Sequence, residues 1–235
     1  PVIEHVLDMF KNPDDVTFIC NEKHLMELDL ENTLKKLSKN CKIIRVPNEG
    51  RKGPVHAVSQ AFSVIDDERP TIVSYCDFGS VWNYDEFLKF AEEKGCDGCI
   101  PCYTGFHPHL LGQDKYAIVN LNEDGWAESI KEKGSSDNKM DDLTSSGAYY
   151  FKSGSLVKKY FQKFLDVGET INGEYYVSLV YNLLIEDGLK VNTFQIEKML
   201  QWGTPYDVEE FKRWERYFSS AQNILIKNPP KTTLI

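Results

Sequence analysis

The sequence has no long apolar run and a shortage of basic residues. No apolar stretch approaches the ~18 residues that cross a bilayer, and Glu4, His5 and Asp8 interrupt the first apolar segment, unlike a secretory signal. The 235 residues contain 27 Lys plus Arg against 36 Asp plus Glu, a net charge of −9. Nucleic acid is therefore not expected as a partner, because clustered cations hold its phosphates. We expect a soluble, cytoplasmic protein with no membrane span.

Cysteines are few, with six in the whole chain, too few to cross-link a chain of this length. Cys96, Cys99 and Cys102 form a C-x-x-C-x-x-C string that could suggest zinc or an iron–sulfur cluster. No fourth cysteine follows, and the string lies in a predicted strand whose side chains alternate between two faces. We therefore favour the interpretation that these cysteines are reduced and serve as small apolar residues.

Apolar residues in the first half alternate between strand-like and helix-like spacing. Strands are predicted at residues 15–20, 41–46 and 71–76, and helices at residues 1–10, 25–37, 54–65 and 84–94. Short apolar strands that alternate with amphipathic helices indicate a parallel sheet covered on both faces.

The second half is richer in turns. Residues 122–125 are turn formers between strand-like residues 116–121 and 127–131, which predicts a hairpin. Further elements are predicted at 146–151 (strand), 156–165 and 175–186 (helices), 190–196 (strand) and 207–218 (helix). Periodicity ends at Ser219, and Asn228-Pro229-Pro230 is typical of a linker. We expect one domain over residues 1–218 and a tail over residues 219–235 that leads to a further module.

Asp77 directly follows the apolar run of residues 71–76. Ligands of parallel α/β sheets bind beyond the carboxyl ends of the strands, so this carboxylate is expected to face a ligand. Such a group suits Mg²⁺, which bridges one or two protein oxygens and substrate phosphates. The alternative is a cap for the helix predicted from Tyr84, from which Asp77 is rather distant.

Each of the other candidate site residues could have an ordinary structural role instead of a role in ligand binding. Glu132 and Lys133 lie side by side at a strand end, where charged residues are also common on solvated surfaces. Gly147 interrupts a strand and could mark close approach of a ligand to the backbone. Glu174 begins a helix, where the helix dipole favours a carboxylate in any case.

These motifs are more informative together than singly because of their order along the chain. Along the chain the motifs are Asp77, Glu132-Lys133, Ser146-Gly147-Ala148-Tyr149-Tyr150-Phe151, Gly173-Glu174-Tyr175-Tyr176 and Gly203-Thr204-Pro205. Together they resemble the sugar-phosphate nucleotidyltransferases, especially the branch found in bacterial capsule and surface-polysaccharide clusters. The resemblance implies a single Rossmann-like, three-layer α/β domain with a mixed, mostly parallel sheet. This fold is called nucleotide-diphospho-sugar transferase-like, or GT-A type.

The resemblance also implies a reaction. A phosphate oxygen of a sugar phosphate, or of a similar small phosphorylated metabolite, would attack the α-phosphorus of an NTP and release pyrophosphate. Asp77 would hold Mg²⁺, the implied cofactor, against both substrates, and Lys133 would neutralise the acceptor phosphate. Gly53 and Pro54 would contact the nucleotide base. Such chemistry requires mainly positioning and charge neutralisation.

On the acceptor side, the resemblance implies that Glu132, the backbone of Gly147, Glu174 and Tyr176 hold the acceptor's polar groups. The product would serve surface-polysaccharide synthesis. The sequence fixes neither the nucleotide nor the oligomeric state.

Two departures from the family's pattern keep other functions open. The family's Gly-rich nucleotide loop would precede Pro1 and is missing from this sequence, and Gln201 replaces an aspartate that many relatives use as a second metal ligand. An amide is a poorer Mg²⁺ ligand than a carboxylate. One alternative is a GT-A type glycosyltransferase, although Asp77-Phe78-Gly79 lacks the D-x-D pair usual in those enzymes. The other is an inactive domain that binds nucleotides or sugars.

Overall fold

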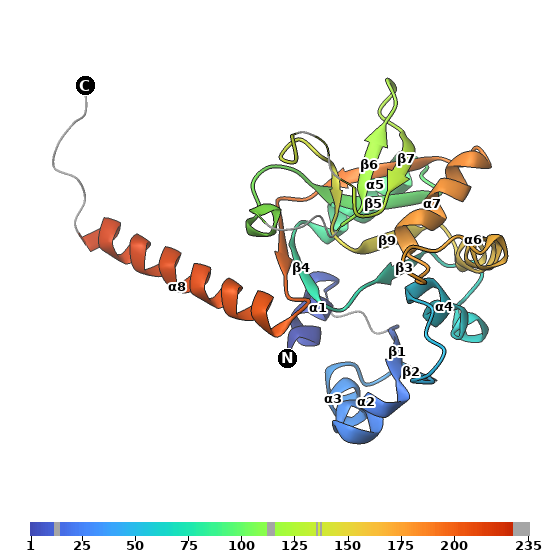
Figure 1. Ribbon diagram of the computed structural model, residues 1–235, viewed down its shortest axis with the longest axis horizontal. Coiled ribbons are helices and arrows are strands. Elements are labelled where there is room, and N and C mark those ends of the chain that lie inside the picture. The colour runs from blue at the N-terminus through green and yellow to red at the C-terminus, as the bar shows by residue number, and fades with distance from the viewer. Residues whose placement is uncertain (12–14, 112–115, 135, 137, 228–235) are drawn as a thin grey trace.

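A computed structural model describes the chain except residues 12–14, 112–115, 135, 137 and 228–235. Strands and helices alternate along its first half, and a central sheet is flanked by helices, which confirms the α/β fold (Figure 1). None of the described helices combines the length and the apolar character needed to cross a membrane.

The central sheet has seven strands in the order β3-β9-β5-β8-β6-β7, with β10 also paired to β5. Their bounds are β3 (Thr71–Ser74), β5 (Gly98–Tyr103), β6 (Ile118–Leu121), β7 (Ala127–Lys131), β8 (Thr144–Ser145), β9 (Ala148–Phe151) and β10 (Val191–Gln195). The predicted hairpin is confirmed as β6 and β7, whose turn is closed by the Asn122 side chain accepting hydrogen bonds from two backbone N–H groups.

The expectation of mostly parallel pairing is wrong for this sheet. Among its described pairings, only that of β10 with β5 is parallel. The reason is that β8 and β9 run antiparallel between β3, β5 and β6, which themselves share one direction. Strands with a common direction are thus separated by an opposed one, and their carboxyl ends still lie at one edge of the sheet.

Helices cover both faces of the sheet and make three layers. One face carries α4 (Pro54–Ser59), α6 (Gly154–Val167) and α7 (Val177–Glu186), and the other carries α1 (Val2–Met9) and α5 (Tyr84–Glu93). Alternation along β9 fits this arrangement, because Phe151 packs edge-on against Phe161 of α6, whereas Tyr150 packs against Phe87 of α5. The predicted three-layer arrangement is confirmed.

The three clustered cysteines lie in this core. Cys96 and Cys99 pack with Phe87 on the α5 side, whereas Cys102 packs on the opposite face with the α6 and α7 side chains. Their division between two faces agrees with the interpretation of the string as apolar core residues.

Two smaller sheets complete the fold. Strands β1 (Thr17–Asn21) and β2 (Lys42–Val46) pair in parallel, and β4 (Phe78–Val81) pairs antiparallel with β11 (Lys198–Gln201). The sequence did not predict β4 or β11. The helix predicted over residues 25–37 is two helices, α2 (Glu22–Glu27) and α3 (Leu30–Leu37), and the one predicted over 54–65 is α4 followed by a 3₁₀ turn, Phe62–Val64.

The last helix, α8 (Pro205–Lys227), extends away from the remainder of the molecule (Figure 1). The sequence predicted its end at Phe218 and a tail from Ser219. Residues 219–227 contain no Gly or Pro that would stop a helix, so it continues nine residues further. The remaining part of the predicted tail, residues 228–235, lies outside the described residues.

Candidate active site

Asp77 lies between β3 and β4, at the sheet edge where a ligand-facing carboxylate was predicted. Its backbone carbonyl accepts a hydrogen bond from the Trp202 N–H at 2.9 Å, which ties it to the end of β11. The side chain is exposed, yet the surrounding protein partly desolvates it, and this desolvation raises the pKa of the carboxyl group. Nearby Asp207 raises this pKa further.

Asp207 is a second carboxylate that sequence reasoning missed. A Cβ placed on Gly203 would lie 3.1 Å from Asp77 Oδ2 and 3.7 Å from Asp207 Oδ2, so the two carboxylates flank this glycine. Gln201 Nε2 donates to Asp207 Oδ1 at 2.6 Å, and Thr204 Oγ1 donates to Asp207 Oδ2 at 2.7 Å. The Asp207 N–H in turn donates to Thr204 Oγ1 at 3.1 Å, a reciprocal cap at the start of α8. The Thr204-x-x-Asp207 spacing was the available signal.

The oxygen-rich surroundings of Asp77 suit a hard cation. The described residues contain no group of three or more His, Cys, Asp or Glu arranged to hold a metal ion. Mg²⁺ does not require one, since it is commonly held by one or two carboxylates, substrate phosphates and water. Asp77, with Asp207 nearby, therefore fits Mg²⁺ as a ligand set completed by substrate.

Glu132 follows β7 and is held by Ser178 of α7, whose hydroxyl donates to Glu132 Oε2. Ser178 is fully buried. Burial raises the pKa of Glu132, and the Ser178 hydrogen bond and the Lys133 charge partly offset that rise. The carboxylate is thus fixed by one donor at the end of a strand.

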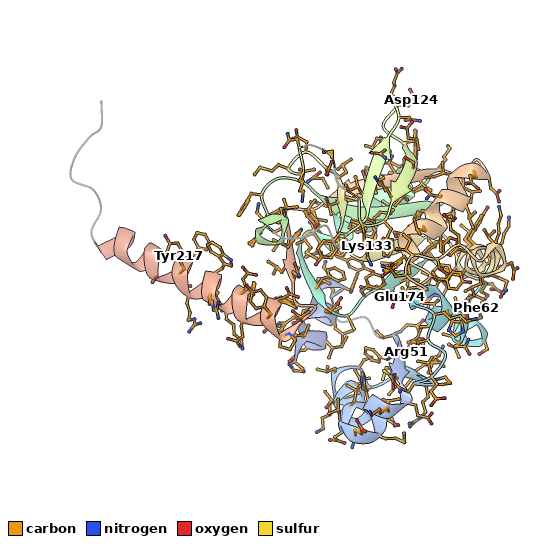
Figure 2. The ribbon with its side chains drawn as sticks, viewed as in Figure 1. Arg51, Phe62, Asp124, Lys133, Glu174 and Tyr217 are labelled. Atoms are coloured by element: carbon orange, nitrogen blue, oxygen red, sulfur yellow. The ribbon has the colours of Figure 1, made fainter. Side chains whose placement is uncertain are left out.

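Lys133 and Tyr176 are in direct contact. Lys133 Nζ donates to the Tyr176 hydroxyl at 3.0 Å and lies 4.9 Å from the centre of its ring. The Tyr176 hydroxyl donates to Glu174 Oε2 at 2.6 Å. Figure 2 shows Lys133 and Glu174 near the middle of the molecule, with Arg51 on the segment below them.

Gly53 joins this group through the backbone. The Tyr175 N–H donates to the Lys52 carbonyl at 2.8 Å, and the Val55 N–H donates to the Tyr175 carbonyl at 3.1 Å. Gly53 has φ +90°, and a Cβ there would lie only 2.7 Å from the Tyr175 nitrogen. The residues on either side of Gly53 and Pro54, the predicted nucleotide segment, are therefore hydrogen-bonded to Tyr175, which lies between Glu174 and Tyr176 of the predicted acceptor segment.

Gly147 connects the two groups of residues. It lies between β8 and β9 with φ +103°, and a Cβ there would lie 3.3 Å from ring atoms of both Phe78 and Tyr75, the neighbours of Cys76 and Asp77. The Tyr75 N–H donates to the Gly147 carbonyl at 3.1 Å. Burial raises the pKa of Tyr75, and the charge of Glu132 adds to that rise, so Tyr75 lies within electrostatic reach of Glu132.

The structure thus brings the predicted residues into two adjoining groups. Asp77 lies with Gly203 and Asp207, while Glu132, Lys133, Glu174 and Tyr176 gather beside Gly53 and Pro54, and Tyr75 and Gly147 lie between the groups. Within the described part of the chain, no hydrogen bond or ion pair joins Asp77 directly to Lys133.

An open pocket of about 640 Å³ lies elsewhere, between α1 and β4. His5, Lys11, Trp82 and Trp202 are among the residues that line it, and none of the predicted site residues does. The candidate site therefore rests on the charges and contacts at the strand ends.

The three-layer α/β fold, with acidic and basic groups at its strand ends, defines a protein of the class that binds ligands beyond the carboxyl ends of its strands. Residues 1–187 match the model of the nucleotidyl transferase family. The chain belongs to that family. Comparison with curated proteins finds no match.

Solved structures with the same fold share little sequence with this chain. A nucleoside-diphosphate-sugar pyrophosphorylase from Vibrio cholerae RC9 superposes with a TM-score of 0.69 at 19% identity, over 90% of this chain and 87% of that one. A UDP-glucose pyrophosphorylase complexed with UDP-glucose gives 0.65 at 15% identity, over 92% and 87%. HddC from Yersinia pseudotuberculosis gives 0.57 at 16% identity, over 89% and 81%.

Proposed function

We propose that this protein transfers an NMP group from an NTP to a sugar phosphate or a similar small phosphorylated metabolite, with release of pyrophosphate. The observation that carries the proposal is the gathering of Glu132, Lys133, Glu174 and Tyr176 beside Gly53, in a chain that belongs to the nucleotidyl transferase family. This group of side chains can hold a phosphate and hydroxyls, and support for a nearby metal site comes from Tyr75 and Phe78, which flank Cys76 and Asp77 in the sequence and pack against Gly147.

At the nucleotide end, Asp77 would hold Mg²⁺, with the Asp207 carboxylate on the other side of Gly203. Bound Mg²⁺ would offset negative charge on the triphosphate. The Gly53 and Pro54 segment would contact the base. An oxygen of the acceptor phosphate forms a bond to the α-phosphorus as the bond from that phosphorus to the bridging oxygen breaks, and the electron pair leaves with pyrophosphate.

At the acceptor end, Lys133 would neutralise the acceptor phosphate as a compact cation. Glu132 and Glu174 can accept hydrogen bonds from hydroxyl groups. Gly147 would contribute backbone groups to the acceptor, while the space that a Cβ would occupy there faces the rings of Phe78 and Tyr75. Burial raises the pKa of Glu132, so its role as an acceptor requires a pH at which it is ionised.

The choice of a sugar phosphate is supported by the described relatives, two of which are pyrophosphorylases of nucleotide sugars by name. A role in bacterial capsule or surface-polysaccharide synthesis is supported by the order of motifs from Asp77 to Gly203. A cytoplasmic location is proposed together with this role.

The test is a pyrophosphate-release assay with each NTP, Mg²⁺ and a panel of phosphorylated metabolites. We expect release with one pairing, and a loss of roughly a thousandfold in Asp77→Asn because charge stabilisation is removed without a change in shape. Asp124→Asn, the same change at the exposed hairpin tip (Figure 2), should retain activity. Absence of release from every pairing, or equal activity in Asp77→Asn, would refute the proposal.

A further inference from the structure

Lys133 has an unusual backbone. Its φ is +53°, in the left-handed region that side chains other than glycine seldom adopt. Such strain persists only where the surrounding structure fixes it, and it is concentrated at functional sites. The strained backbone directs Lys133 Nζ to Tyr176, 43 residues further along the chain.

Tyr176 contacts Lys133 in two ways. Its hydroxyl accepts from Nζ at 3.0 Å, and its ring lies 4.9 Å from the same nitrogen. Because the hydroxyl donates its own proton to Glu174 at 2.6 Å, its lone pairs face the ammonium group. Glu174 thereby fixes the orientation of the hydroxyl, and Lys133 donates to the lone pair that this orientation presents.

The direction of the pKa shift of Lys133 agrees with these contacts. The Tyr176 hydrogen bond is the largest cause of a raised pKa at Lys133, and Glu132 and Glu174 add to it. The amine therefore remains a cation at neutral pH. It is otherwise largely exposed, and a free lysine of this kind samples many rotamers, with about 2 kcal/mol of side-chain entropy to lose on binding.

We infer that Tyr176 is a positioning residue: with Glu174 as its anchor, it holds the Lys133 ammonium in place before the acceptor phosphate arrives. The inference rests on the proposed function for the identity of that phosphate. Fixing a flexible cation in advance strengthens binding by reducing the ordering required on association. Tyr176 acts through Lys133 and not through a bond of its own to the acceptor phosphate.

The first test compares Tyr176→Phe with wild type in steady-state kinetics. The variant retains the ring and loses the oxygen, so we expect the acceptor KM to rise about tenfold, the value for one charge-assisted hydrogen bond. We expect kcat and the KM for NTP to change by less than about twofold. Tyr217→Phe, at an exposed tyrosine of α8, is the matched control and should behave as wild type.

A double-mutant cycle tests the anchor. The probe is inorganic phosphate as a competitor of the acceptor, because it has no sugar hydroxyls that Glu174 could contact directly. Glu174→Gln should lower the affinity for phosphate by less than Tyr176→Phe does. The effects of the two changes on phosphate affinity should be less than additive, because both act through Lys133. Full additivity would contradict the inference.

A direct readout separates this inference from the proposed function. In protein labelled with ¹³C-lysine, the Lys133 Cε resonance, assigned with Lys133→Arg, is titrated with pH and with inorganic phosphate. Tyr176→Phe should lower the pKa of Lys133, and the phosphate concentration that gives half of the maximal shift should rise about tenfold. These results without pyrophosphate release from any pairing would refute only the proposed reaction. Pyrophosphate release with an unchanged Lys133 pKa and unchanged acceptor KM in Tyr176→Phe would refute only the positioning role.

Discussion

Gly53→Ala should disturb the proposed acceptor site, although Gly53 belongs to the predicted nucleotide segment. Gly53 has φ +90°, and an added Cβ would lie 2.7 Å from the Tyr175 nitrogen and 3.0 Å from both the Tyr175 carbonyl oxygen and Glu174 Cβ. Those atoms are backbone or the base of a side chain, so they cannot rotate away. The segment that carries Glu174 and Tyr176 must move instead.

The size of the effect follows from these distances. Ordinary contact begins near 3.4 Å, so the segment must shift by about 0.7 Å. That shift stretches the two backbone hydrogen bonds between Tyr175 and residues Lys52 and Val55, at about 1 kcal/mol each. A left-handed backbone costs alanine about 1–2 kcal/mol more. We expect a loss of roughly 3–4 kcal/mol in the free energy of unfolding.

The assay pairs chemical denaturation with both Michaelis constants. Displacement of Glu174 and Tyr176 should raise the acceptor KM at least tenfold, because misplacement on the order of 1 Å can cost a hundredfold in rate. Gly50→Ala is the matched control, since Gly50 has φ +69° but would place no atom within 4 Å of its Cβ. It should lose only about 1–2 kcal/mol and leave the acceptor KM unchanged.

The reasoning would be refuted if Gly53→Ala raised the KM for NTP alone. It would also fail if Gly50→Ala and Gly53→Ala changed stability and acceptor KM equally, because the effect would then come from backbone strain and not from the contact with Tyr175.

Two further predictions concern pH. Ser178→Ala removes the hydrogen bond that offsets part of the effect of burial on the pKa of Glu132, so this pKa should rise further. The acid limb of kcat/KM for the acceptor should then move to higher pH, and an unmoved limb would exclude Glu132 from acceptor binding. Burial lowers the pKa of His107, whose Nε2 accepts from the Met199 N–H at 3.1 Å. As pH falls below about 6.5, His107 is therefore protonated in the unfolded chain before it is protonated in the folded protein. The free energy of unfolding, measured by denaturation at several pH values, should fall more steeply with pH in wild type than in His107→Gln. Equal slopes in the two proteins would contradict this.

The layers of the fold could be predicted because their signal is local. Tyr149, Tyr150 and Phe151 alternate between two faces, and the turn around Asn122 contains its own hydrogen-bond acceptor. The position of Asp77 shortly after β3 could be predicted for the same reason, since it directly follows the apolar run of residues 71–76, while its role stays a prediction. Periodicity within a short window is sufficient for each.

Features that depend on distant partners could not be predicted. Strands β4 and β11 are short and contain glycine or charged residues, and each exists because it pairs with the other, as in the register of Ser80 with Met199. The direction of β8 and β9 between other strands is equally invisible in a local pattern, so the sheet was expected to be mostly parallel. Contact between Lys133 and Tyr176 also requires the chain to fold back over 43 residues.

Asp207 shows an intermediate case. Its spacing from Thr204 is a recognisable helix cap, but its approach to Asp77 depends on the turn at Gly203 between β11 and α8. From the sequence alone, an Asp207 that only caps α8 cannot be told from one that also lies near Asp77, because the path of the turn is not known. Gln201, which stands where a second carboxylate was expected, is turned to Asp207 by a hydrogen bond.

Paramagnetic broadening provides the sharpest test of a single site shared by metal and acceptor. With Mn²⁺ in place of Mg²⁺, an α,β-methylene NTP analogue to prevent turnover, and the acceptor that the pyrophosphate assay identifies, the ³¹P resonance of the acceptor phosphate should broaden strongly in wild type and in Asp124→Asn. Broadening should disappear in Asp77→Asn, which would lose the proposed metal ligand, and weaken in Lys133→Ala, which would lose the proposed phosphate contact. Equal broadening in wild type and Asp77→Asn, or none in wild type, would contradict the account.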